Sequence, residues 1–143
     1  MGVTKMSKRR KGIRRRKKRS AGFNPKAADC HHLLWQARHW DYGSAKALRN
    51  HDYFKMLIPR DTVHREIHSR IADIPMPGQE LCKMALRAVN QGLKDGILNM
   101  VDDSAEQRLD FLIWLWEDKG RERTVTMLRW QKEVFAEFNE RGN

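Results

Sequence analysis

Apolar positions recur at helical spacing through the second half of the chain. They fall into two sets, the first being Leu81, Ala85, Val89 and Leu93 and the second Met127, Trp130, Val134 and Phe138. Side chains three or four positions apart share one face of a helix. Between the two sets, Ser104 and Gln107 form a capping-box pattern ahead of another apolar run. The pattern predicts three helices, and residues 75–143 are expected to form a small helical bundle with an aromatic core.

Ahead of this bundle the pattern changes to short apolar runs separated by polar residues. Residues 30–36 and 53–58 are typical of short strands, and the polar connection between them has room for a helical turn at 44–49. Val63, Ile67 and Ile71 then recur every four residues, after an Asp61 or Thr62 that can cap a helix of about ten residues. The order strand, connection, strand, helix and bundle predicts an α+β fold. Residues 26–74 are expected to form one unit on which residues 75–143 pack.

Charge separates the N-terminal segment from the rest of the 143-residue chain. Residues 1–28 hold 12 of the 29 Lys and Arg and no acidic residue, so the other 17 basic residues face all 18 acidic ones. Like charges repel and bury no apolar surface, so residues 1–25 are predicted to be a disordered tail. A polyanion is the expected partner: DNA, or RNA, rather than an import receptor or anionic lipid. The residues expected to bind nucleic acid here are Lys8, Arg9, Arg10, Lys11, Arg14, Arg15, Arg16, Lys17, Lys18 and Arg19.

Several classes of protein do not fit the composition. The longest strongly apolar run, at 111–116, is far shorter than the roughly 20 residues that cross a bilayer, and no apolar segment follows the N-terminal charges as in a signal peptide. Cys30 and Cys82 lie too far apart in sequence to suggest a zinc knuckle. A soluble protein of the cytoplasm is expected, or of the nucleus if the source is eukaryotic, with no membrane partner.

All six histidines fall between positions 31 and 68. His64 and His68 stand four residues apart on the predicted helix, where two imidazoles can bind one divalent metal. His31 and His32 are adjacent, and neighbouring side chains on a strand point to opposite faces. One of them can therefore complete the metal site while the other faces a water and accepts its proton. Cys30 is expected to be a small buried residue, with a thiolate ligand in place of His31 as the alternative.

These four histidines, in this order, resemble the HNH endonucleases. Residues 29–72 look most like the colicin-type branch, in which a His-His doublet opens a ββα-metal finger and a His-x-x-x-His helix closes it. The resemblance implies that His31, His64 and His68 bind the metal and that His32 is the general base.

The resemblance also implies an asparagine that orders the loop beside the base. Asn50 is the default match, although it lies fourteen residues before His64, a longer gap than in the family, and His51 is the alternative. The flanking zinc-knuckle cysteines of many members are missing, so the finger is expected to be stabilised by the C-terminal helices. Small nucleases of this kind look like those of phages and mobile elements, which would place the protein with phage DNA or the nucleoid.

The implied reaction is hydrolysis of phosphodiester bonds with one divalent metal ion. Mg, Mn, Zn and Ni are the candidates, and an all-imidazole site suits the transition metals better than Mg²⁺, which prefers oxygen ligands. Arg60 and Arg65 flank the motif, and either could bind phosphate or simply be solvated.

Three readings of the sequence compete. The first is an HNH-type endonuclease acting on DNA. The second is a nucleic-acid-binding protein of phage, chromosomal or ribosomal type, in which the same finger holds a structural metal. The third is an RNA binder that relies on the tail, with unremarkable histidines. His32 separates the first two, because a structural site does not need an imidazole beside its ligand.

Overall fold

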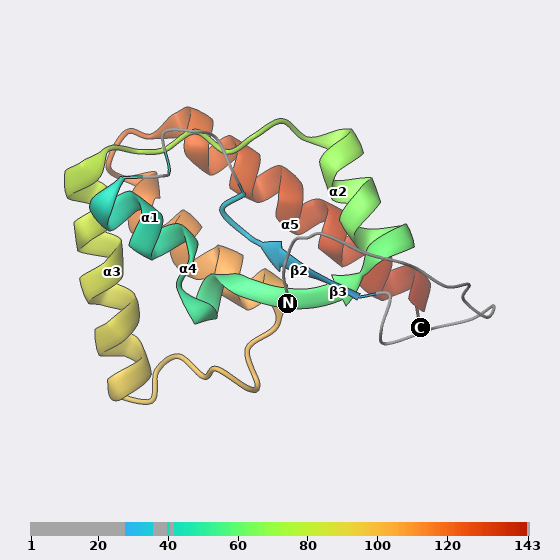
Figure 1. The fold of residues 1–143 in the computed structure, drawn as a ribbon, viewed down its shortest axis with the longest axis horizontal. Coiled ribbons are helices and arrows are strands. Elements are labelled where there is room, and N and C mark those ends of the chain that lie inside the picture. The colour runs from blue at the N-terminus through green and yellow to red at the C-terminus, as the bar shows by residue number, and fades with distance from the viewer. Residues whose placement is uncertain (1–27, 36–39, 41, 143) are drawn as a thin grey trace, which may run out of the picture.

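The computed structural model describes residues 28–35, 40 and 42–142 of the chain. The predicted tail, with the ten residues expected to bind nucleic acid, and the end of the first predicted strand lie outside the described residues. The described part is α+β, with one antiparallel pair of strands and five α-helices. Helices α1 (Gly43–Arg49) and α3 (Gln79–Lys94) lie together on one side, α2 (Arg65–Arg70) lies on the other, and the strands, α4 (Ala105–Glu117) and α5 (Glu122–Gly142) lie between them (Figure 1).

The strands β2 (Ala28–His32) and β3 (Lys55–Pro59) form the sheet, in a register that places His31 opposite Met56. The predicted bounds of both strands were wrong. The first strand ends at His32 because Leu33 and Leu34 turn into the core, where both are fully buried. The second begins only at Lys55, after the 3-10 turn η4 (Asp52–Phe54).

The predicted helical turn at 44–49 is confirmed as α1. The helix after β3 has about the expected length but differs in its first turn, because a π-helical segment, η5 (Arg60–His64), leads directly into α2. It starts straight after Pro59 without a side-chain cap, so the prediction of Asp61 or Thr62 as the cap was wrong. Such single π turns occur often at functional sites.

The C-terminal helices agree with the predicted pattern. Ser104 accepts a hydrogen bond from the Gln107 backbone and Gln107 accepts one from the Ser104 backbone, so both halves of the capping box are present at α4. Two aromatic residues of these helices lie at the surface and not in the core, with Trp114 exposed by 69% and Trp130 by 45%. None of the described helices is long and apolar enough to cross a membrane.

A buried arginine joins the sheet region to the C-terminal helices. Arg108 of α4 donates to the backbone carbonyls of Tyr53, Met100 and Asp103 at 2.7 to 2.9 Å, and its guanidinium lies 4.8 Å from the centre of the Tyr53 ring. The η4 turn that leads into β3 is therefore held by α4, and the core draws on both halves of the chain.

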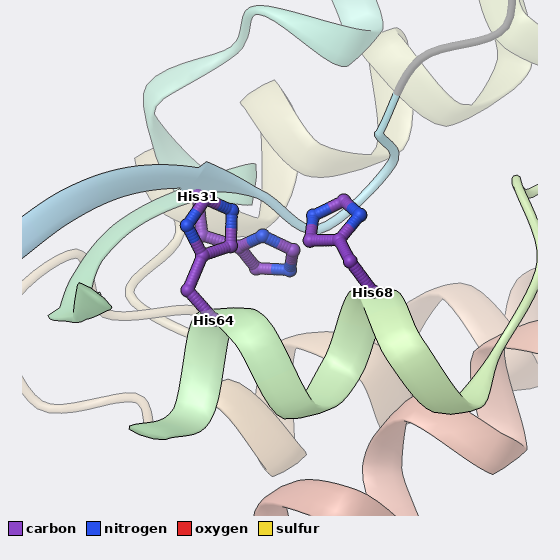
Figure 2. A group of neighbouring side chains, drawn as sticks. All are labelled: His31, His64 and His68. Carbon is purple, nitrogen blue, oxygen red and sulfur yellow. The ribbon is translucent and has the colours of Figure 1, made fainter. Parts of the chain in front are cut away.

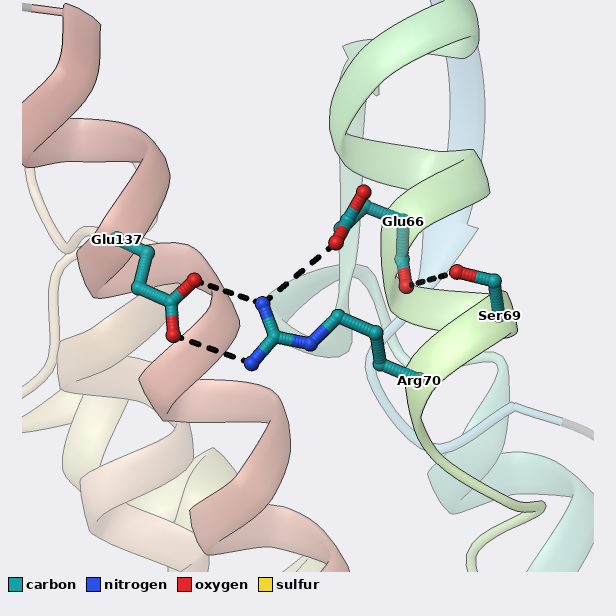
Figure 3. A network of polar contacts seen from close by, with 4 residues as sticks. All are labelled: Glu66, Ser69, Arg70 and Glu137. Atoms are coloured by element: carbon teal, nitrogen blue, oxygen red, sulfur yellow. Dashed lines mark hydrogen bonds and ion pairs between the residues drawn. The ribbon is translucent and has the colours of Figure 1, made fainter.

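Helix α2 is tied to α5 by an ion pair (Figure 3). Arg70 donates two hydrogen bonds to the carboxylate of Glu137, at 2.7 and 3.1 Å, and lies 3.6 Å from Glu66 on its own helix. A two-point contact fixes orientation better than a single one. This contact helps to set α2, with its histidine, against α5.

Candidate metal centre

Three imidazoles converge between β2 and the helix that follows β3 (Figure 2). The ring centres of His31, His64 and His68 are 5.0, 5.4 and 4.7 Å apart in pairs. One nitrogen of each ring lies within 4.8 Å of a nitrogen of the other two. Three neutral imidazoles at this spacing can bind one divalent ion. The structure thus brings together the three residues predicted as metal ligands.

Two of the ring nitrogens that face away from the centre have partners. Nε2 of His31 lies 2.7 Å from Oε1 of Gln131, and Nδ1 of His64 lies 2.8 Å from Oδ2 of Asp29. The other carboxylate oxygen of Asp29 accepts from Arg60. Metal-binding histidines usually make such a bond with their second nitrogen, which orients the ring. Nδ1 of His31 is buried and has no hydrogen-bond partner among the described residues. A bound cation would satisfy it, so the residues fit a metal.

His68 completes the group from the solvent side. It is exposed, whereas His31 is fully buried and His64 is half-buried. Its ring packs at 4.8 Å on Trp35, whose indole donates a 2.8 Å hydrogen bond to Asp73. The centre is therefore closed on one side and accessible on the other.

The histidine doublet lines a single cleft of about 490 Å³ together with the other two ligands and Arg49. The alternation expected of a strand holds for burial, since His31 is buried and His32 is half-buried. Both side chains nevertheless reach the same cleft, at the point where β2 ends. His32 is not one of the three converging residues, so it is free for another role beside them.

Asn50, the residue expected to order the loop beside His32, lies next to it. The side chain of Asn50, the residue after α1, interacts with the His32 ring, where it opposes the lowering of the His32 pKa by burial, and it accepts a hydrogen bond from Arg49 at 3.2 Å. The alternative residue, His51, instead contacts Asn90 at 2.8 Å and accepts from the Tyr53 backbone, and it does not line the cleft. The long gap between Asn50 and His64 is taken up by η4, β3 and η5.

The flanking residues differ from expectation in part. Arg60 binds Asp29, and neither Arg60 nor Arg65 lines the cleft. Cys30 was predicted to be buried but is exposed at the cleft, because its position on β2 faces outward. Burial of part of the side chain raises the pKa of the Cys30 thiol. Its sulfur is not among the converging ligand atoms of the described residues.

Several residues at the site were not predicted from the sequence, among them Asp29, Arg49 and Gln131. Arg49 lines the cleft and lies directly before Asn50, so its position in sequence was a usable signal. Gln131 comes from the middle of α5, and nothing in the sequence links it to His31, a hundred residues away.

Burial favours the neutral form of both residues of the doublet. Desolvation lowers the pKa of His31 to about 3, against the opposing effect of its contact with Gln131, and the nearby His64 and His68 lower it further. Desolvation also lowers the pKa of His32 to about 4, helped by the positive charges of Arg49 and Lys55. Neutral imidazoles are the form that binds a metal or accepts a proton.

The metal-free protein should lose stability as the pH falls from about 7.5 to 5. His31 stays neutral in the folded state but takes up a proton near pH 6.5 when unfolded, so its contribution is complete above about pH 6.5 and declines below it. At about pH 5 the expected loss from His31 is about 2 kcal/mol. Urea unfolding with a chelator present measures this, and equal free energies of unfolding at both pH values would contradict it.

No family model matches the chain, and no match was found among curated proteins or solved structures.

Proposed function

We propose that the protein is a metal-dependent endonuclease of the HNH type that hydrolyses phosphodiester bonds in DNA. In this proposal the segment from β2 to α2 acts as the ββα-metal finger. The observation that carries it is the convergence of His31, His64 and His68 beside a fourth histidine, His32, in one open cleft.

The three converging histidines would hold one divalent cation. An all-nitrogen ligand set suits Zn²⁺, Ni²⁺ or Mn²⁺ better than Mg²⁺. When bound, the ion supplies stabilisation of the negative charge that develops on the phosphate and its leaving oxygen. Asp29 and Gln131 orient two of the rings and so prepare the site.

His32 is assigned the role of general base. Its interaction with Asn50 would help to orient the ring, and its lowered pKa keeps it neutral near pH 7, so it can accept a proton from the attacking water. A phosphodiester in the cleft brings a negative charge, which would raise this pKa toward the range where proton transfer is most effective. Arg49, at the same cleft, is placed to contact a phosphate oxygen.

Access to the site favours catalysis over a structural metal. Structural metal sites are closed by protein ligands, whereas catalytic ones keep a position open. The exposure of His68 and the cleft of about 490 Å³ leave room for a phosphate and a water. A purely structural metal would need only its three ligands, so it would not account for His32 and Asn50 beside them.

Plasmid DNA should be cut by the wild-type protein in the presence of Mg²⁺, Mn²⁺, Ni²⁺ or Zn²⁺, and cleavage should stop when EDTA is added. His64→Ala should bind the ion more weakly by more than the roughly 10- to 100-fold loss that changes outside the ligand set cause, and cleavage should fall with it. His51→Ala is the matched control, because His51 lies outside the cleft. Absence of cleavage by a wild-type protein that demonstrably binds the ion would refute the proposal.

A further inference from the structure

Gln131 is a buried polar residue that bridges α5 and the candidate metal centre. Its side chain is fully buried, it lies in the middle of α5, and both ends of its amide have a partner. Nε2 of the amide donates to the backbone carbonyl of Leu33 at 2.9 Å, while Oε1 lies 2.7 Å from Nε2 of His31. A buried glutamine with both ends engaged has one orientation available to it.

That orientation determines where the proton of His31 lies. The Leu33 carbonyl can only accept, so the amide nitrogen must face it and the amide oxygen must face His31. The oxygen in turn can only accept, so Nε2 of His31 must carry the proton. The lone pair then lies on Nδ1, the buried atom without a partner among the described residues. A buried acceptor left without a partner destabilises the protein, and a bound cation removes that penalty.

We propose that Gln131 is a positioning residue that holds His31 in the tautomer with Nε2 protonated, so that a divalent cation is bound through Nδ1. This inference rests on the proposed metal site. Asp29 has the opposite effect on His64: it accepts from Nδ1 and leaves Nε2 for the cation. The strand ligand and the helix ligand thus present different ring nitrogens, each selected by a partner from a different part of the chain.

Helix α5 contacts both elements that carry the candidate metal ligands, so its packing affects their positions. Phe135, one turn after Gln131, packs on His31 with ring centres 6.2 Å apart, and Glu137 holds Arg70 of α2. Both sides of the histidine cluster are therefore anchored to α5. The affinity of the site for its cation should depend on this helix, although none of the three ligands comes from it.

The test compares three α5 variants with the wild type. Gln131→Met removes the acceptor at similar size, Gln131→Glu keeps an acceptor, and Thr124→Val is the matched control. Thr124 is also buried in α5 and donates to a backbone carbonyl, that of Pro75, at 2.9 Å, so its loss destabilises the protein without touching His31. The readouts are the His31 tautomer from ¹H–¹⁵N NMR of the metal-free protein and the affinity for Zn²⁺ from a chelator competition.

The wild-type spectrum should show His31 protonated at Nε2. Gln131→Met should lose this single tautomer and bind Zn²⁺ about 10 to 100 times more weakly, while Gln131→Glu should recover most of the affinity and Thr124→Val should bind as the wild type does. A wild-type His31 protonated at Nδ1, or unchanged Zn²⁺ affinity in Gln131→Met, would overturn the inference. The tautomer is measured without metal or DNA, so it tests the role of Gln131 even if the protein does not cleave DNA.

Discussion

Replacing His32 with Ala should lower the rate of DNA cleavage by about 10²- to 10⁴-fold, the range in which a positioned general base contributes. Metal binding should be unchanged, because His32 is not one of the three converging ligands. The two readouts are plasmid cleavage at saturating metal and Zn²⁺ affinity from competition with a chelator. A large loss of cleavage at constant affinity separates the base from the ligand beside it.

The neighbouring doublet residue supplies the matched comparison. His31→Ala removes a ligand and should reduce both cleavage and affinity, whereas His32→Ala should reduce cleavage alone. Equal cleavage by His32→Ala and the wild type would remove His32 from the reaction and leave a metal site without a base. That result would favour the non-catalytic alternative of a nucleic-acid-binding protein with a structural metal.

Local rules predicted the helices better than the strands. A capping box and a four-residue repeat concern neighbours along the chain, so α3 and α4 follow from their own residues. The end of β2 depends instead on a distant contact: Leu33 turns into the core and its backbone amide bonds the Phe54 carbonyl at 2.7 Å. The apolar run alone does not indicate that turn, because a buried turn and a buried strand have the same composition.

At the candidate site, too, features set by neighbours in sequence were predictable and features set by distant contacts were not. The His64–His68 spacing and the doublet give three converging nitrogens because helix geometry places one pair and the pairing of β2 with β3 brings the third. Which nitrogen each ring presents was not predictable. It depends on Asp29 and Gln131, and Gln131 reaches His31 only after α5 has packed against the sheet.

Deleting residues 1–20 should flatten the salt dependence of DNA binding. The deletion removes 11 of the 29 basic residues and no acidic one, which leaves 18 of each sign. If the tail neutralises about six to ten phosphates, the affinity of the full chain should fall by about 10³- to 10⁵-fold between about 50 and 200 mM salt. The reason is that counterions released from the DNA gain less entropy when the surrounding salt concentration is higher. The truncated chain should lose far less. The measurement is a titration of labelled duplex DNA at four salt concentrations.

The same deletion separates binding from chemistry. The three converging histidines and His32 all lie outside the deleted segment, so Zn²⁺ affinity should be unchanged and cleavage should slow only through weaker binding. At low salt and saturating DNA the truncated protein should therefore cut at the rate of the full chain, with the difference appearing in KM. An unchanged salt slope would show that the described part of the chain binds DNA by itself, and Arg49 at the cleft would then be the first residue to replace.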